Sequence, residues 1–282
     1  MQMSEPSPTD RVAYLGPEGT YSHAALIRYF GSDQNGSPVD DIPAVFSSVD
    51  SGATSLGLVP VENSTEGSIT QTLDCFGKYA LNIIGEVMLR IEHCLLATAA
   101  TQAAGITRIV SHQQSLGQCR HWLEDHYPKI DKVSLFSNAV AAKAAANETG
   151  VAAIAGRTAA SIYGLRILDE NIEDIHDNTT RFAVISKTTK SPPTGKDKTS
   201  LIISTRNEPG ALFDALEPFK NHAVNLIKLE SRPSRKEAWS YSFFVDIDGH
   251  SDDDNIRDAL AEVSRHTLEC RVLGSYPAAA SE

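Results

Sequence analysis

Residues 187–198 read KTTKSPPTGKDK and divide the sequence into two regions with different patterns. The stretch is rich in lysine, contains two prolines and a glycine, and has no large apolar side chain. Such a composition interrupts helices and strands and gives the chain nothing to bury. We therefore predict a linker over residues 188–198, between a large region at 11–187 and a small domain at 199–278.

The region after the linker shows strand and helix patterns in the order β-α-β-β-α-β. Its clearest strand has apolar residues at every second position from Trp239 to Ile247, the period of a half-buried strand. Its first helix follows Pro209, and its second begins at acidic residues near Asp252 and ends at basic Arg265, as the helix dipole favours. This order predicts a ferredoxin-like module of about 80 residues.

The region before the linker alternates strands with helices, which predicts an α/β fold with largely parallel sheets. We expect strands at 11–16, 55–59, 82–87, 91–97, 106–111, 132–136, 150–154 and 181–186, and helices at 20–30, around 45–49, and at 69–76, 116–126, 139–147 and 157–163. The first ten residues have no such pattern and are predicted to be a disordered tail.

Composition excludes several classes of function. The formal net charge of −11 argues against nucleic acid or an anionic membrane as the main partner. The N-terminus lacks the pattern of an export signal, and no apolar run approaches the roughly 18 residues that span a bilayer. The four cysteines are scattered and lack metal-type spacing, so we expect reduced thiols in a cytoplasmic protein and no metal site.

A glycine-rich turn, GPEGTYS at residues 16–22, lies between the first predicted strand and helix. Backbone N–H groups at that helix start, with the hydroxyls of Thr20 and Ser22, suit a carboxylate or a phosphate. An ordinary turn with a capped helix would produce the same pattern. The turn lacks the lysine of a P-loop and the spacing of a dinucleotide-binding motif.

Three more polar groups follow predicted strands, where open α/β sheets place their ligands. They are VPVENSTEG at 59–67, SHQQ at 111–114 and the pair Ser137-Asn138. Capped loops and a surface histidine at His112 are the alternative interpretation.

The segment DNTTRF at 177–182 enters the last strand before the linker. Strand alternation places Thr180 and Phe182 on one face and Arg181 on the other. Arginine can clamp a carboxylate, although an exposed ion pair is the default interpretation.

In series, these motifs resemble the prephenate dehydratase family. GPEGTYS, VENSTEG, SHQQ, AAIA at 152–155 and NTTRF occur in this order, and GALF at 210–213 with ESRP at 230–233 resembles the ACT regulatory domain of that family. The resemblance covers about residues 11–277. Gln113 departs from it, because the family usually has proline there. No helical chorismate mutase segment precedes Arg11, so a monofunctional chain is expected.

The resemblance implies two lobes similar to those of periplasmic binding proteins, with the active site in the cleft. Lobe one would be 11–88 plus 180–187, and lobe two would be 89–179. The family's reaction converts prephenate to phenylpyruvate with loss of CO2 and water, and needs no cofactor. Thr180 is implied as the catalytic residue, in a positioning or relay role. The implied substrate-binding residues are Thr20, Tyr21, Ser22, Glu62, Asn63, Ser64, Ser111, His112, Gln114, Ser137, Asn138, Arg181 and Phe182.

The same resemblance implies feedback by phenylalanine and a homodimer or homotetramer. The implied effector-binding residues are Asn207, Gly210, Ala211, Leu212, Glu230, Ser231, Arg232 and Pro233. Arogenate is an alternative substrate. A non-catalytic amino-acid sensor and a two-lobed solute-binding protein are the alternatives from other classes.

Overall fold

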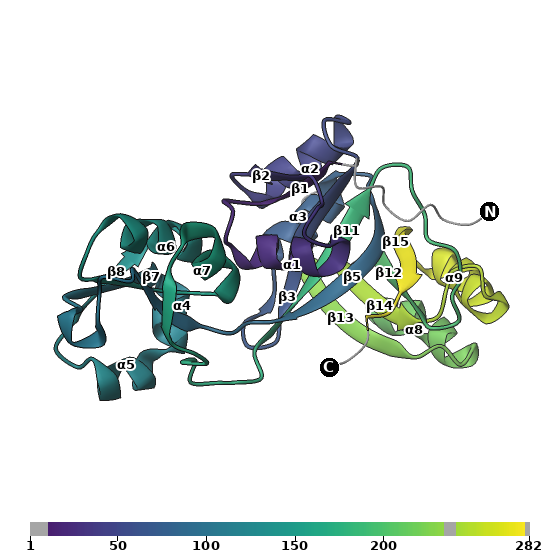
Figure 1. Cartoon of the computed structure of the whole chain (residues 1–282). Coiled ribbons are helices and arrows are strands. Elements are labelled where there is room, and N and C mark those ends of the chain that lie inside the picture. Colours follow the sequence, from purple (N-terminus) through teal and green to yellow (C-terminus); the bar gives the residue numbers. More distant parts are fainter. Residues whose placement is uncertain (1–10, 234–240, 280–282) are drawn as a thin grey trace.

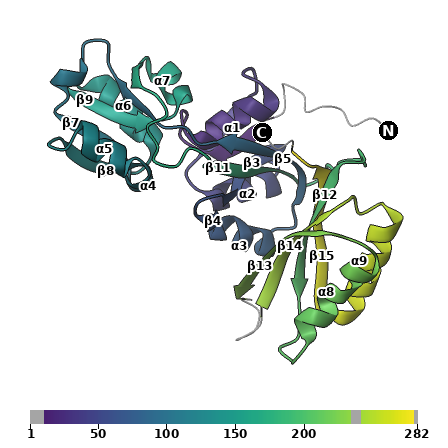
Figure 2. The same cartoon turned by 90° about the horizontal axis from the view of Figure 1, so that it is seen from below.

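The structure is a computed structural model that describes residues 11–233 and 241–279. Three sheet-based bodies lie in a row, with lobe two at one end, lobe one in the middle and the C-terminal domain at the other end (Figure 1). The view from below shows the same order (Figure 2). The predicted tail at 1–10 and the predicted strand position Trp239 lie outside the described residues.

Lobe one is built on a sheet with the strand order β2-β1-β3-β11-β5, and a short strand β4 pairs with β3. Apolar faces of α1, α2 and α3 pack on this sheet around Val12, Leu58 and Phe46, which are all buried. The bounds are β1 (Val12–Leu15), α1 (Tyr21–Phe30), β2 (Gly36–Val39), α2 (Ile42–Asp50), β3 (Leu56–Asn63), β4 (Gly67–Ser68), α3 (Thr70–Lys78), β5 (Asn82–Arg90) and β11 (Thr179–Ser186).

Lobe two is built on a sheet with the order β10-β6-β9-β7-β8. The predicted helix at 116–126 is interrupted at Cys119 and forms two short helices instead. The bounds are β6 (Cys94–Ala97), the 3-10 turn η1 (Ala103–Gly105), β7 (Arg108–His112), α4 (Gln113–Gln118), α5 (Arg120–His126), β8 (Asp131–Leu135), α6 (Asn138–Asn147), β9 (Val151–Ala155), α7 (Arg157–Tyr163) and β10 (Arg166–Asp169).

The prediction of largely parallel sheets is only half right. Parallel pairing is confined to β2-β1-β3 in lobe one and β9-β7-β8 in lobe two. The returning strand β11 lies between β3 and β5 and runs in the opposite direction, so both of these pairings are antiparallel. The short strands β2, β4 and β10 escaped prediction, since none carries a long apolar pattern.

The C-terminal domain has the predicted β-α-β-β-α-β order and an antiparallel sheet, β13-β14-β12-β15. Both helices pack on one face of that sheet around Leu201, Val245 and Phe219. The bounds are β12 (Asp197–Ser204), α8 (Ala211–Asn221), β13 (Leu226–Pro233), β14 (Tyr241–Asp248), α9 (Asp254–His266) and β15 (Glu269–Pro277).

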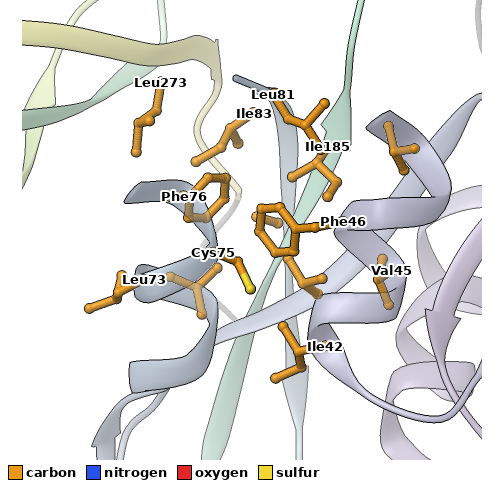
Figure 3. Close-up of a cluster of buried hydrophobic side chains, with 14 of the residues drawn as sticks. Ile42, Val45, Phe46, Leu73, Cys75, Phe76, Leu81, Ile83, Ile185 and Leu273 are labelled. Atoms are coloured by element: carbon orange, nitrogen blue, oxygen red, sulfur yellow. The ribbon is translucent and has the colours of Figure 1, made fainter. Parts of the chain in front are cut away.

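The other face of the same sheet packs against lobe one. Figure 3 shows Leu273 of β15 beside Phe76 and Ile83 of lobe one. Ile202, Phe244 and Tyr276 join this buried cluster, and each fully buried apolar side chain contributes about 1.5–3 kcal/mol. At Gly274 a side chain is impossible without movement, because a Cβ there would lie 2.0 Å from the carbonyl oxygen of Ile83. The small domain is therefore packed directly onto the catalytic region.

The predicted linker is also attached to the protein surface. The hydroxyl of Ser191 is buried and donates to the carbonyl oxygen of Ile84 at 2.6 Å, and His250 lies 3.0 Å from the Ser191 carbonyl oxygen. Asp197 and Lys198 already belong to β12. Ser191 thus holds the segment to lobe one and to the C-terminal domain, and the composition did not reveal these contacts.

Candidate active site

The centre of the candidate site is a cross-strand pair, Thr180 on β11 and Asn63 on β3. Both side chains are nearly buried, and the Asn63 amide nitrogen lies 2.9 Å from the Thr180 hydroxyl oxygen. The Asn63 carbonyl oxygen accepts from the backbone N–H groups of Thr65 and Glu66. Because an N–H can only donate, these two bonds fix which way the amide points. The Thr180 oxygen therefore accepts from Asn63, and its own O–H remains available as a donor.

The returning chain is held to the same loop. Ser64 donates its backbone N–H to the carbonyl oxygen of Thr179 at 2.8 Å and accepts from the Thr179 N–H at its hydroxyl. The buried Asn178 accepts from the Asn63 amide at 2.7 Å. Ser64 thus acts as a clamp between two segments. Asn178 was missed by sequence reasoning, although it lies inside the NTTRF motif.

On lobe two, a second polar group forms at the carboxyl ends of β7 and β9. The Ser111 hydroxyl is fully buried and donates to the carbonyl oxygen of Ile154 at 2.7 Å. The Asn138 amide nitrogen contacts the hydroxyls of Ser111 and Ser115 and the same carbonyl oxygen. Its two hydrogens are thus engaged inside the lobe, and Asn138 can offer a ligand only its carbonyl oxygen. That acceptor suits a hydroxyl of a substrate, and the Ser111 hydroxyl has already donated its hydrogen within the lobe.

Tyr21, one of the predicted substrate-binding residues, connects the two lobes through its hydroxyl. Its hydroxyl lies 2.9 Å from the carbonyl oxygen of Glu92 and 2.7 Å from His93 Nδ1, and His93 Nε2 lies 2.8 Å from Gln118 Oε1. Burial raises the pKa of Tyr21, and burial lowers the pKa of His93, so both groups are neutral near pH 7. A side chain at Gly156 would meet the Tyr21 ring at 3.1 Å. The start of α1 therefore lies against the carboxyl end of β9, and the carboxyl edges of both lobes face one another.

Replacing Tyr21 with phenylalanine should weaken this junction. The variant leaves Nδ1 of the buried His93 ring without its hydrogen-bond partner, so we expect unfolding by urea to show a loss of about 1–2 kcal/mol. Tyr163→Phe is the matched control, because its hydroxyl also joins the lobes, at 2.8 Å from the Glu18 carbonyl oxygen, but through a solvent-exposed hydrogen bond. Equal losses in the two variants would contradict the special role of Tyr21.

Two of the predicted substrate-binding residues cap helices, which was the alternative interpretation of these motifs. The Thr20 hydroxyl lies 3.0 Å from the carbonyl oxygens of Leu15 and Pro17 and accepts from the N–H of His23. Ser137 caps α6 in the same way. Ser22 is buried, His112 is half-buried at the start of α4, and Gln114 is exposed. These three stay candidates for contact with substrate.

Three other predicted substrate residues are taken up by contacts within the protein. Phe182 lies in the core of lobe one, with an exposed fraction of 2%. Arg181 is on the opposite face from Thr180, as strand alternation required, and is bound there to the C-terminal domain. Glu62 pairs with Lys228 of that domain at 2.8 Å. Burial and these partners exclude the predicted substrate contacts of Phe182, Arg181 and Glu62 in this conformation.

The predicted effector residues gather at one end of the C-terminal sheet. Strands β12 and β13 lie on either side of β14 and run in the same direction. Asn207–Leu212 follows β12 and Glu230–Pro233 forms the end of β13, so both segments lie at the same end of the sheet. Gly210, with φ of +85°, allows the turn before α8. Arg232 reaches lobe one, where it pairs with Asp74 at 3.1 Å. Beside this ion pair lies a cavity of about 530 Å³ between α3 and the sheet, which the sequence did not predict.

Neither a membrane helix nor a metal site is found within residues 11–233 and 241–279. No helix there is long and apolar enough to cross a membrane. The same residues contain no group of three or more His, Cys, Asp or Glu side chains that could hold a metal ion. Burial raises the pKa of Cys94 to about 11, and the four cysteines, all of them within the described residues, form no disulfide.

The structure combines a two-lobed α/β region, with a buried polar pair on the returning strand β11, and a ferredoxin-like domain. This combination defines a ligand-binding enzyme with a regulatory module. The sequence profile of the prephenate dehydratase family matches residues 12–190, and the ACT domain profile matches residues 199–265. This chain therefore belongs to the prephenate dehydratase family.

Individual relatives agree with this family. A bifunctional chorismate mutase/prephenate dehydratase of Pseudomonas aeruginosa is 50% identical over 269 residues, which are 95% of this chain and 73% of that protein. The crystal structure of prephenate dehydratase from Arthrobacter aurescens in complex with L-Phe is 35% identical and has a TM-score of 0.88, covering 95% of this chain and 90% of that one. A structure described as GqqA, a novel type of quorum quenching acylase, is 30% identical with a TM-score of 0.87, covering 95% and 98%. The predicted fold class and the predicted lyase reaction, prephenate to phenylpyruvate, are confirmed.

Proposed function

We propose that Thr180 donates a hydrogen bond to the ring hydroxyl of prephenate as that hydroxyl leaves. The observation that carries this proposal is the bond from the Asn63 amide to the Thr180 oxygen, which leaves the threonine O–H as a donor. A hydroxyl is a poor leaving group, and hydrogen-bond donation lowers the barrier to its departure. Because the pKa of a threonine hydroxyl is high, Thr180 orients and relays a proton and is not its final source.

The ring carboxylate leaves as CO2, and the two losses together give an aromatic ring. Aromatisation supplies the driving force, so this reaction needs neither a metal nor another cofactor. We place the substrate between the Thr180–Asn63 pair and the carboxyl edge of lobe two. Support for this placement comes from the contact of Tyr21 with Glu92 and His93, which brings the two edges together.

The substrate is a dianion, and helix starts at these edges supply donors for it. The first turn of α6 points its backbone N–H groups toward the carboxyl edge of lobe two, and such groups favour anions. Ser22 and His112 lie at the starts of α1 and α4, and Gln114 lies in the first turn of α4. We assign the carboxylates to this set, and the Asn138 carbonyl oxygen to a substrate hydroxyl.

An isosteric change at Asn63 tests the donor geometry. In Asn63→Asp the side chain still accepts from the backbone of Thr65 and Glu66, but the donor to Thr180 becomes an acceptor. The Thr180 hydroxyl then turns its proton toward residue 63, so we expect kcat to fall at least about tenfold, equivalent to one hydrogen bond to a charged group. KM should change less than kcat in steady-state assays. A kcat within twofold of wild type would contradict the arrangement.

For the ACT domain we propose phenylalanine as feedback effector. The Arthrobacter aurescens relative is a complex with L-Phe, and it covers 95% of this chain. The turn at Asn207–Leu212 offers backbone N–H groups to a carboxylate, and Glu230–Pro233 lies at the same end of the sheet. The strand β14 lies between them in one chain, so we infer that the two segments meet across a subunit interface.

We further propose that the chain forms a homodimer or homotetramer in the cytoplasm. Strand β13 is an outer strand of its sheet, and Ile227 and Leu229 on it are 45% and 43% exposed. Phe213, 68% exposed, lies on α8 beside the predicted effector turn. Outer strands with apolar side chains favour pairing with a second copy. Four cysteines that form no disulfide in the described part of the chain fit a reducing compartment.

One assay separates these proposals from their alternatives. The protein is incubated with prephenate and, separately, with arogenate, and phenylpyruvate and phenylalanine are measured with and without added phenylalanine. We expect phenylpyruvate from prephenate, and less when phenylalanine is present. Phenylalanine from arogenate at a higher kcat/KM would identify an arogenate dehydratase, and binding without product would identify a sensor. An acylase activity is not favoured, because the hydrogen-bond partner of Thr180 in the described residues is an amide donor and not a base.

A further inference from the structure

Two neighbouring cross-strand pairs lie on the same two strands but face opposite sides of the sheet. Thr180 pairs with Asn63, and the next pair along is Arg181 with Glu62. The first pair faces the cleft between the lobes. The second pair faces the ACT domain, and each of its members is bound there by a separate strand.

Arg181 is held by three side chains. Its Nε lies 2.7 Å from Glu86 of β5, its Nη1 lies 2.5 Å from Asp246 of β14, and its Nη2 lies 2.8 Å from the Tyr276 hydroxyl of β15. The Arg181 side chain is only 8% exposed. Ser200 of β12 donates to Asp246 and contacts the Tyr276 hydroxyl, so three strands of the ACT sheet converge on one guanidinium.

Glu62 is held by β13, the strand that carries the predicted effector residues. Lys228 Nζ lies 2.8 Å from Glu62 Oε2, and the Lys228 side chain is 14% exposed. Lys228 Nζ is buried and makes no hydrogen bond there, so the contact is an ion pair with a Glu62 side chain that is 36% exposed. Lys228 precedes Glu230 by two residues, so both side chains are on the same face of β13.

The second pair lies directly next to an irregularity of the sheet. The register of β11 against β3 shifts directly after Arg181, where Val61 is the extra residue of a bulge. Bulges set the direction in which the neighbouring side chains point. A movement of Glu62 or Arg181 toward or away from the ACT domain also displaces Asn63 and Thr180 on the other face, because one peptide unit joins Glu62 to Asn63 and another joins Thr180 to Arg181.

We propose that the ACT domain controls the reaction by positioning Thr180 through the Arg181–Glu62 pair, with Lys228 and Tyr276 as its contacts. This inference rests on the proposed function, since it assigns a route to the regulation described there. A ligand bound at Glu230–Pro233 shifts β13, Lys228 moves with it, and Glu62 transmits the shift to Asn63. Lys228 and Tyr276 are positioning residues that touch no substrate.

The kinetic test uses two variants and a control. Lys228→Gln and Tyr276→Phe each remove one contact to the Arg181–Glu62 pair. Arg271→Gln removes one positive charge at the same interface, but Arg271 reaches the carbonyl oxygens of Phe76 and Tyr79 at the end of α3. Saturating phenylalanine lowers kcat by some factor in wild type, and we expect this factor to be at least about fivefold smaller in Lys228→Gln. The phenylalanine Kd measured by calorimetry should be unchanged. Arg271→Gln should keep the wild-type response.

A second measurement needs neither prephenate nor phenylalanine. In ligand-free protein, Lys228→Gln should raise amide hydrogen exchange in the segments 60–65 and 179–182 by at least about threefold, and Arg271→Gln should not. If wild type makes no phenylpyruvate, the proposed function fails, and this exchange result still decides the positioning role. Unchanged exchange in those segments, or a full phenylalanine response in both Lys228→Gln and Tyr276→Phe, overturns the proposal.

Discussion

The Thr180→Ala variant should lose nearly all turnover and keep its fold. The threonine hydroxyl is the only group of this side chain that can donate to the departing ring hydroxyl, and such assistance accounts for about 10²–10⁴-fold in rate. The structural cost is small, because the methyl-sized cavity left at Thr180 lies at a strand end and Asn63 still bonds to Asn178. We expect kcat to fall about a thousandfold, with Tm and phenylalanine affinity close to wild type.

Two controls make this result specific. Thr180→Ser keeps a hydroxyl at the same place and should retain at least about a tenth of kcat, since one hydrogen bond of changed geometry costs about 1 kcal/mol. Thr179→Ala changes the neighbouring threonine on the opposite face of the strand and should remain active. A Thr180→Ala variant with near-normal kcat would remove Thr180 from the reaction. Equal losses in Thr179→Ala would point to strand distortion instead.

Periodicity predicted most elements of this fold. The alternation from Phe243 to Ile247 predicted β14, and Pro209 predicted a helix start close to that of α8, because each signal depends only on neighbours in the chain. The direction of β11 was not predictable in this way. It depends on where the chain returns between β3 and β5, and two strands of the same composition can pair in either direction.

For the candidate site, alternation correctly placed Thr180 and Arg181 on opposite faces. The inference that Arg181 binds substrate failed because nothing in the local sequence shows that a second domain lies behind that face. Its partners Asp246 and Tyr276 are 65 and 95 residues away. Asn138 shows a related limit. Its side chain stands at the expected edge, but only the acceptors around it determine that its amide nitrogen points inward.

The prediction for Arg181 therefore concerns the stability of the fold and not the binding of a substrate carboxylate. In Arg181→Met the buried Asp246 loses its countercharge, whereas Glu86 keeps Lys198 at 2.9 Å. Removing one partner of a buried ion pair costs about 3–5 kcal/mol, so urea unfolding at pH 7 should show a loss of this size. Adding Asp246→Asn to this variant removes the unpaired charge and should restore at least about half of the loss, as a double-mutant cycle would measure.

The pH dependence of that loss distinguishes an unpaired charge from simple loss of packing. In wild type, burial raises the pKa of Asp246, but Arg181 outweighs burial, so the pKa lies below the ordinary value of 3.8. The pair therefore stabilises the fold above about pH 4 and loses that effect as the pH falls through the folded-state pKa. Without Arg181, burial raises the Asp246 pKa above its unfolded value, and the variant gains from protonation below neutral pH. The difference in unfolding free energy between wild type and Arg181→Met should thus shrink steadily from pH 7 to pH 4. A difference that is constant over this range would show that the guanidinium contributes packing and not charge.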